Sequence, residues 1–348
     1  MGTVPGSART LDVTPITGWL LEHLPDTSAP FGATLIAGGR SNLTFLLKDA
    51  DGQAFCLRRP PGGPVLPTAH DMGREERIIR ALTDTSVPVP QVYGFSGDDH
   101  LLGSPFYVMQ FVEGSILRSR SDAEKMSETT RRMASESLVD VLAALHEVSP
   151  DSIGLGDFAR RDGYIERQLS RWIAQFRSSA DDEDEGSRLM ELAHKRLVAL
   201  VPPQQKTSIV HGDYKLDNVV LAADGTVRAV LDWEISTLGD PLADLGSLSA
   251  YWTDPGERER VLQRPSPSSA PGFLLRSEVQ GRYAKQSRLD PSDLNFYIAF
   301  GLWKIGCILQ GVYARYRSGA AAGDESTVED FEVRILNLAR ESLETLSL

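Results

Sequence analysis

The sequence VHGDYKLDNVVLAADGTVRAVLDWE, residues 210–234, carries the most specific pattern in this chain. Within it, residues 219–222 and 227–231 are short apolar runs of the kind found in β-strands. The pair Asp224-Gly225 stands between the two runs and is a signal for a tight hairpin turn. We therefore expect a β-hairpin, in which the second strand brings the chain back to the start of the first.

This hairpin predicts which polar side chains should meet. Asn218 precedes the first strand and Asp232 follows the second strand. Because paired strands lie only about 5 Å apart, the two side chains should end side by side. Amide and carboxylate oxygens suit Mg²⁺, which takes a few protein ligands and completes its octahedron with phosphate oxygens and water. Asp213, one loop earlier, is left to face an attacking hydroxyl, so the pattern predicts a site for phosphoryl transfer.

The composition is that of an ordinary soluble globular protein. The 348 residues are 41% hydrophobic and 24% charged, and they are enough for two lobes with separate cores. The formal net charge of −12 argues against a nucleic acid as the main partner. Cys56 and Cys307 lie far apart in sequence and outside any metal-ligand spacing, so we expect a reduced, cytoplasmic chain.

No membrane association is expected. The N-terminus has no basic segment followed by an apolar core, which a signal peptide would need. The most apolar stretch, residues 296–312, contains Lys304 and Gln310 and is too short to cross a bilayer comfortably. This stretch is therefore predicted to be a buried helix.

The chain divides into a strand-rich part and a helical part. The strand-like segments of the first part are residues 33–36, 43–48, 54–58 and 106–112, with helices near residues 11–24 and 71–82. The pattern becomes helical from residue 127 onward. We predict an α+β fold in which residues 1–112 form a small antiparallel-sheet N-terminal lobe that begins with a helix. Residues 113–348 should form a larger helical C-terminal lobe.

HGDYKLDN followed by VLDWE resembles the catalytic core of the aminoglycoside phosphotransferase and choline kinase group of protein-kinase-like enzymes. Within that group, the chain is most similar to the kinase domain associated with acyl-CoA dehydrogenase-type proteins. The motifs that support this closer match are GGRSN, FCLRRPPGG, LPTAHDMGREERII, FYVMQFVEG, STLGDPLADLG and FYIAF...GVYARY. They extend from about residue 38 to 316. The resemblance implies a bilobal protein-kinase-like fold that uses ATP and Mg²⁺.

The resemblance also implies a separate role for each polar residue of the opening stretch. Asp213 would accept the proton of the substrate hydroxyl or orient it, while Asn218 and Asp232 would hold the metal ions. Lys215 stands where many protein kinases carry a lysine that meets the transferred phosphate, and its charge would offset the developing negative charge. An ordinary exposed loop lysine explains Lys215 equally well. His211 is expected to brace the loop through its ring nitrogens.

In the first lobe, Arg58 aligns with the strand lysine that pairs the α- and β-phosphates in protein kinases. A guanidinium is always charged and can hold phosphate oxygens in a bidentate manner. Glu75 or Glu76, on the following helix, should pair with Arg58, and the motif favours Glu75. Both positions remain open at this point.

Two further segments are assigned by resemblance to nucleotide binding. Ser41 and Asn42 lie where the phosphate-covering loop is expected, although the full G-x-G-x-x-G pattern is absent. Residues 109–114 resemble the hinge between the lobes. There the Gln110 carbonyl and the Val112 amide would pair with the edge of adenine.

Three residues of the second lobe are expected to be structural. Asp240 and Asp244, in GDPLADLG, should tie down the catalytic loop by hydrogen bonding. His146 lies beside an apolar helical stripe and is predicted to be a hydrogen-bonded core histidine.

Together these residues predict a kinase that moves the γ-phosphoryl group of ATP to the hydroxyl of a small-molecule acceptor. The acyl-CoA dehydrogenase-type resemblance favours a hydroxyacyl-CoA or a hydroxy acid. An aminoglycoside kinase would need acidic groups in its pocket and a choline-type kinase an aromatic cage. The sequence does not decide among these acceptors. The alternative from another class is a catalytically silent nucleotide-binding regulatory module, against which the presence of Asp213, Asn218 and Asp232 argues.

Overall fold

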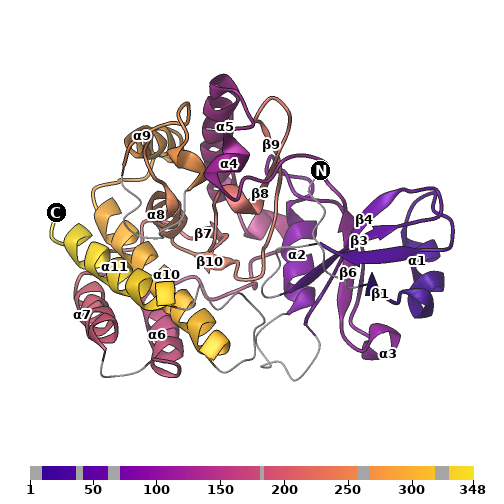
Figure 1. The fold of residues 1–348 in the computed structure, drawn as a ribbon, viewed down its shortest axis with the longest axis horizontal. Coiled ribbons are helices and arrows are strands. Elements are labelled where there is room, and N and C mark those ends of the chain that lie inside the picture. The colour runs from indigo at the N-terminus through magenta and orange to yellow at the C-terminus, as the bar shows by residue number, and fades with distance from the viewer. Residues whose placement is uncertain (1–9, 37–41, 62–70, 181–183, 258–265, 318–328) are drawn as a thin grey trace. The chain divides into compact units, whose positions relative to one another are not determined.

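A computed structural model describes residues 10–36, 42–61, 71–180, 184–257, 266–317 and 329–348. The chain forms two compact units (Figure 1). Unit 1 comprises Met1–Glu113 together with Arg228–Glu234, and unit 2 comprises Gly114–Val227 and Ile235–Leu348.

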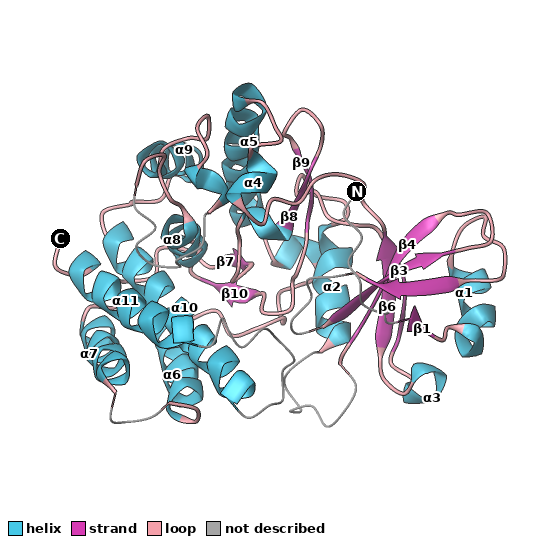
Figure 2. Ribbon diagram, in the orientation of Figure 1, coloured by secondary structure: helices cyan, strands magenta, loops and turns pink. Residues whose placement is uncertain are grey.

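Unit 1 is built on a six-stranded antiparallel sheet with the strand order β1-β2-β3-β4-β6-β5. Its strands are β1 (Thr10–Leu11), β2 (Gly32–Leu35), β3 (Leu43–Lys48), β4 (Ala54–Arg59), β5 (Val92–Ser96) and β6 (Phe106–Gln110). Its helices are α1 (Thr17–His23), which follows the short turn η1 (Thr14–Ile16), α2 (Met72–Leu82) and α3 (Asp99–Leu102). The predicted antiparallel sheet with an inserted helix is therefore present, and Figure 2 shows its strands in magenta.

The two faces of this sheet have different chemistry. Ile16 and Leu20 pack with Leu57 and other apolar strand residues into the core of unit 1. Because side chains alternate along a strand, Arg58 points to the opposite face. On that face it contacts α2, so the sheet separates an apolar core from a charged cluster.

Unit 2 is mainly helical, as the sequence predicts. Its helices are α4 (Arg120–Ala123), α5 (Glu128–Glu147), α6 (Tyr164–Arg177), α7 (Glu185–Ala199), α8 (Leu242–Tyr251), α9 (Arg276–Ser287), α10 (Leu294–Arg317) and α11 (Glu329–Thr345). A short antiparallel sheet joins β7 (Ser208–Val210) to β10 (Thr237–Gly239). A second two-stranded sheet consists of β8 (Val219–Leu221) and β9 (Val227–Val230). The fold class is therefore α+β.

The hairpin predicted from the opening stretch is confirmed. Its turn is closed by hydrogen bonds from Ala222 N to Thr226 O at 2.8 Å and from Gly225 N to Ala222 O at 3.0 Å. Gly225 adopts a left-handed φ of 95°, which explains the need for glycine. The same turn packs on α5, because a Cβ added to Gly225 would lie 2.4 Å from the carbonyl oxygen of Thr130.

The boundary between the units differs from the sequence-based division in one respect. The first unit ends at Glu113, next to the predicted end at residue 112. Residues 228–234, which the sequence division assigns to the second lobe, belong to unit 1. Two contacts hold this segment there: Val230 N donates to Pro88 O at 2.8 Å, and Arg228 Nη1 donates to Glu113 O at 3.2 Å.

Helix α10 is the apolar helix predicted around residues 296–312. Among the described residues it is the one helix long and apolar enough to cross a membrane. In its most apolar stretch of 18 residues, 78% is buried inside the protein. The prediction of a buried core helix is confirmed, although the helix extends to 24 residues.

Close packing of α8 against α10 generates a stability prediction. A Cβ added to Gly246 would lie 2.3 Å from the carbonyl oxygen of Tyr297, a backbone atom that cannot move aside cheaply. We expect Gly246→Ala to lower the free energy of unfolding by about 1–3 kcal/mol or more. Gly281→Ala in α9 is the control, because no atom lies within 4 Å of its added Cβ. In denaturant titrations it should raise stability by about 0.5–1 kcal/mol, and equal effects of the two substitutions would contradict the packing argument.

Candidate functional site

The loop that carries Asp213 begins where β7 ends. Gly212 has a left-handed φ of 87°, and a Cβ there would approach Ile235 to 3.0 Å. The chain can therefore turn sharply at this position only with glycine.

A buried carboxylate fixes the backbone of this loop. Asp244 Oδ2 accepts a hydrogen bond from His211 N at 2.7 Å, and its Oδ1 accepts one from Gly212 N at 2.8 Å. Burial raises the pKa of Asp244, but the hydrogen bond from His146 and the nearby charges and amides together lower it below its usual range. The carboxylate therefore stays ionised, and the expectation that Asp244 ties down the loop is confirmed.

Asp240 has a different role from the predicted one. Its Oδ2 accepts a hydrogen bond from the Tyr297 hydroxyl at 2.6 Å, and its Oδ1 accepts one from Leu242 N at 3.1 Å. These contacts secure the start of α8 and its packing on α10. The expected contact with the catalytic loop is therefore wrong for Asp240, because the loop amides are satisfied by Asp244.

Both predicted support histidines are hydrogen-bonded. His211 Nδ1 accepts from Asp213 N at 3.2 Å, so its ring braces the turn from inside. His146 is buried, with Nδ1 2.6 Å from the Tyr283 hydroxyl and Nε2 3.3 Å from Asp244 Oδ2. These contacts extend the support of the loop from α8 to α5 and α9.

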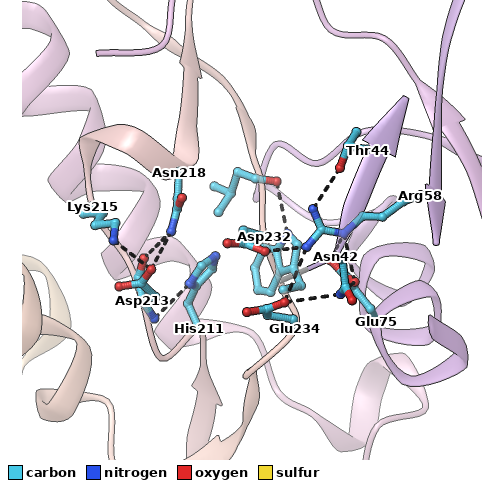
Figure 3. A network of polar contacts seen from close by, with 12 residues as sticks. Asn42, Thr44, Arg58, Glu75, His211, Asp213, Lys215, Asn218, Asp232 and Glu234 are labelled. Carbon is cyan, nitrogen blue, oxygen red and sulfur yellow. Dashed lines mark hydrogen bonds and ion pairs between the residues drawn. The ribbon is translucent and has the colours of Figure 1, made fainter. Parts of the chain in front are cut away.

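Asp213 is the centre of a polar cluster in unit 2. Its Oδ2 accepts a hydrogen bond from Asn218 Nδ2 at 3.0 Å and lies 2.9 Å from Lys215 Nζ. Figure 3 shows both side chains directed at the Asp213 carboxylate. Asn218 Nδ2 also donates to the Asp213 carbonyl at 2.8 Å, which fixes the orientation of the amide. The structure thus brings three predicted site residues together.

Lys215 remains an ammonium in this cluster. Its Nζ lies 4.5 Å from the centroid of the Tyr251 ring, a cation–π contact. Burial lowers the pKa of Lys215, but electrostatic interactions with Tyr251, Asp213 and Asp217 outweigh burial and hold the pKa above its ordinary value. Because its side chain is only 18% exposed and pairs with Asp213, Lys215 is not an ordinary exposed loop lysine.

Arg58 is the centre of a second cluster, in unit 1. Its Nε lies 3.0 and 3.1 Å from the two oxygens of Glu75, and the contact to Oε2 has hydrogen-bond geometry. Its Nη2 lies 2.5 Å from Asp232 Oδ1 and 3.8 Å from Glu234 Oε2 (Figure 3). Burial lowers the pKa of Arg58, but Glu75 and the other surrounding groups raise it above its ordinary value.

The partner of Arg58 is therefore Glu75, the residue that the motif favours. Glu76 instead forms an ion pair with Arg80, one turn further along α2. Asp71 begins this helix by accepting a hydrogen bond from Arg74 N at 2.9 Å. The capped helix thus turns Glu75 toward the sheet and leaves Glu76 to a local partner.

Asn42 joins the same cluster. Its Nδ2 donates to Glu75 Oε2 at 3.3 Å and to Glu234 Oε2 at 3.2 Å. In this structure the Asn42 amide therefore donates to two carboxylates. A contact between Asn42 and phosphate stays a prediction. Ser41, predicted alongside it, lies outside the described residues.

Asp232 is held by its backbone as well as by Arg58. Its φ of 65° lies in the left-handed region, which is uncommon for a residue with a side chain. The next residue, Trp233, is buried and donates from Nε1 to Val230 O at 3.0 Å, which anchors the segment. Asp232 belongs to unit 1 and Asn218 belongs to unit 2. The expectation that their side chains lie side by side therefore stays a prediction.

The predicted hinge residues lie at the end of β6. Gln110 is the last residue of β6, and its backbone N donates to Gln91 O at 2.8 Å. Val112 lies two residues further and is half-buried. Their predicted pairing with adenine through the Gln110 carbonyl and the Val112 amide stays a prediction.

Two charged residues near these clusters were not anticipated as site residues. Glu234 contacts Arg58 and Asn42, and its position two residues after Asp232 was the available signal. Lys304, in α10, donates from Nζ to the Gly212 carbonyl at 2.6 Å. The signal for Lys304 was a single cation within an apolar run, and nothing in sequence indicates its target.

The buried ion pair of Arg58 and Glu75 generates a prediction. Arg58→Met would leave the Glu75 carboxylate, which is 1% exposed, without its main counter-charge. We expect a loss of about 3–5 kcal/mol in the free energy of unfolding, measured by denaturant titration. Arg80→Met is the matched control, since it removes the ion pair of Glu76 with a half-exposed arginine. It should cost less than about 1 kcal/mol, and a comparable loss in both variants would disprove the assignment.

Comparisons with known proteins agree with this architecture. A family model described as the phosphotransferase enzyme family matches residues 32–274. Acyl-CoA dehydrogenase family member 11 of Rattus norvegicus is 33% identical over 347 residues, which cover 96% of this chain. This chain spans only 44% of the length of that relative.

Solved structures show the same fold. The crystal structure of a candidate aminoglycoside phosphotransferase from Ralstonia eutropha is 32% identical, with a TM-score of 0.80 over 97% of this chain and 99% of that chain. A spectinomycin phosphotransferase in complex with ADP and spectinomycin has a TM-score of 0.59 at 14% identity, over 99% of this chain and 100% of that chain. The antiparallel sheet and the helical unit are thus those of a kinase-like fold, and the chain belongs to the phosphotransferase enzyme family.

Proposed function

We propose that this protein transfers the γ-phosphoryl group of Mg-ATP to a hydroxyl group of a small molecule. The observation that carries the proposal is the cluster in which Lys215 and Asn218 converge on the Asp213 carboxylate. A carboxylate of this kind can accept the proton of an attacking hydroxyl. Membership of the phosphotransferase family and the nucleotide bound by the spectinomycin phosphotransferase support the use of ATP.

The residues of unit 2 would have distinct roles in this reaction. Asp213 would orient the acceptor hydroxyl and take its proton as the new bond to phosphorus forms. Lys215, held as an ammonium, would offset the negative charge on the transferred group. The Asn218 side chain donates to Asp213 through Nδ2. Its amide oxygen, Oδ1, accepts no hydrogen bond from the described residues and would therefore be available to bind a cation.

The residues of unit 1 would bind the nucleotide. Arg58 would hold phosphate oxygens, and Glu75 would keep its guanidinium in place. Asp232, whose side chain is 32% exposed, would hold the metal ion together with Asn218. Among the described residues no group of three or more His, Cys, Asp or Glu could hold a metal by itself, so phosphate oxygens and water would complete the coordination. Magnesium, when bound, would neutralise charge on the phosphates.

The acceptor that we propose is a hydroxyacyl-CoA or a hydroxy acid. The similarity to acyl-CoA dehydrogenase family member 11 over nearly the whole chain supports this class. We place the reaction in the cytoplasm, where ATP is available and where Cys56 and Cys307, both buried, would stay reduced. An aminoglycoside acceptor is the second candidate, because the Ralstonia eutropha structure carries that description.

Removal of the Asp213 carboxylate tests the catalytic assignment. We expect Asp213→Ala to lower kcat by about 10²–10⁴-fold, because the hydroxyl loses its proton acceptor. ATP affinity, measured by calorimetry, should change little. Asp224→Ala, in the exposed hairpin turn of the same stretch, is the control and should leave kcat unchanged. Full activity of the Asp213 variant would refute the role of this carboxylate.

A screen of acceptors tests the substrate class. The purified protein would be incubated with Mg-ATP and hydroxyacyl-CoAs, hydroxy acids, aminoglycosides or choline, and phosphorylated products would be identified by mass spectrometry. We expect the highest kcat/KM for a hydroxyacyl-CoA or a hydroxy acid. Transfer to aminoglycosides alone would replace the proposed acceptor. Binding of ATP without transfer to any compound would favour the silent nucleotide-binding module.

A further inference from the structure

Lys304 is a buried lysine in α10, a long and largely apolar core helix. It lies near the middle of α10, and the residue is only 5% exposed. Its Nζ donates a hydrogen bond of 2.6 Å to the carbonyl oxygen of Gly212, the residue that precedes Asp213. A helix 92 residues further along the chain thus reaches the catalytic loop.

The surroundings of Lys304 compensate only part of the cost of burying its charge. An ammonium loses several kcal/mol of hydration free energy when it is buried. An apolar residue at the same core position has no such cost. The Trp172 ring centroid lies 5.6 Å from Nζ, and the charges of Asp213 and Asp244 attract it. Arg171 and Lys215 repel it, and burial lowers the pKa of Lys304 below its ordinary value.

The hydrogen bond to Gly212 completes a clamp on one backbone segment. The Gly212 N–H donates to Asp244, from α8, and the Gly212 carbonyl accepts from Lys304, from α10. The next N–H, that of Asp213, donates to the His211 ring. The peptide plane between Gly212 and Asp213 therefore cannot rotate without breaking one of these bonds. That plane sets the direction in which the Asp213 side chain leaves the backbone.

We propose that Lys304 is a positioning residue for phosphoryl transfer, which holds the Gly212 carbonyl and thereby fixes the placement of the Asp213 carboxylate. This proposal rests on the proposed function, because it assigns Lys304 a part in the same reaction. Lys304 touches no reacting atom and acts through the loop. A misplacement of about 1 Å at a reacting group can lower a rate by about 10²-fold, which sets the size of the expected effect.

A second buried side chain of α10 serves as a control that distinguishes the positioning of Asp213 from general packing of the helix. Gln310 Nε2 donates to the Ser179 carbonyl at 2.8 Å, so a neutral amide satisfies a backbone carbonyl in a comparable position. Ser179 lies outside the catalytic loop. Gln310→Met therefore removes the same kind of hydrogen bond from α10 without affecting Asp213, and it is the matched control.

The test compares Lys304→Met with Gln310→Met in the full chain. We expect Lys304→Met to lower kcat by about 10²-fold while KM for ATP changes by less than about threefold, since Arg58 and Asp232 are untouched. Gln310→Met should leave kcat within about twofold of the wild type. Folding of both variants would be checked by circular dichroism and thermal melting. A folded Lys304→Met variant with wild-type kcat overturns the proposal.

Hydrogen exchange gives a readout that does not depend on activity. In Lys304→Met the backbone amides of residues 211–218 should exchange faster, while the rest of unit 2 and the Gln310→Met variant should match the wild type. Unchanged exchange in this segment overturns the clamp even if activity is lost. If the wild type phosphorylates no acceptor, the proposed function fails, and hydrogen exchange still decides whether Lys304 orders the loop.

A rescue experiment covers the case in which Lys304→Met does not fold. Lys304→Ala removes the side chain beyond Cβ, and propylammonium, added to the assay, can supply an N–H donor and a positive charge at the vacated position. We expect propylammonium to restore kcat at least about tenfold. Tetramethylammonium, which has the charge but no N–H group, should not restore it. Equal effects of the two cations, or rescue by neither, would count against the proposal.

Discussion

The site depends on one interaction, the acceptance of two consecutive backbone N–H groups by the buried carboxylate of Asp244. Hydrogen bonds to an ionised acceptor are stronger than neutral ones, and each contributes on the order of 1.5–3 kcal/mol. Asp244 lies on α8, which packs closely on α10 through Gly246. The position of the loop that carries Asp213 therefore depends on how α8 packs against α10.

Arg58 in unit 1 and Lys304 in unit 2 are both buried, and their surroundings satisfy them in different ways. In unit 1 the buried guanidinium of Arg58 faces the carboxylates of Glu75 and Asp232, so the charges compensate one another directly. In unit 2 the amino group of Lys304 donates a hydrogen bond to a carbonyl, with the carboxylates of Asp213 and Asp244 nearby rather than in contact. Buried charges are retained only where partners of this kind satisfy them.

Much of this arrangement could be predicted from sequence because it is encoded locally. Turn residues and β-rich runs predicted the hairpin at Asp224-Gly225, and a long apolar pattern predicted α10. The motif on α2 also indicated Glu75 as the partner of Arg58. The hydrogen-bond partners of Asp240 and Lys304 were not predictable, because each depends on a residue brought near only by helix packing.

The sequence by itself determined the family, the division into a strand-rich part and a helical part, and the residue types of the site. Periodicity and turn chemistry act over a few residues, so they can be read without knowledge of the fold. Only the tertiary structure decided that residues 228–234 pack with the first unit and that Lys304 meets Gly212. Contacts between residues far apart in the chain leave no periodic signal. They arise only when the apolar faces of separate elements come together and bury the polar groups between them.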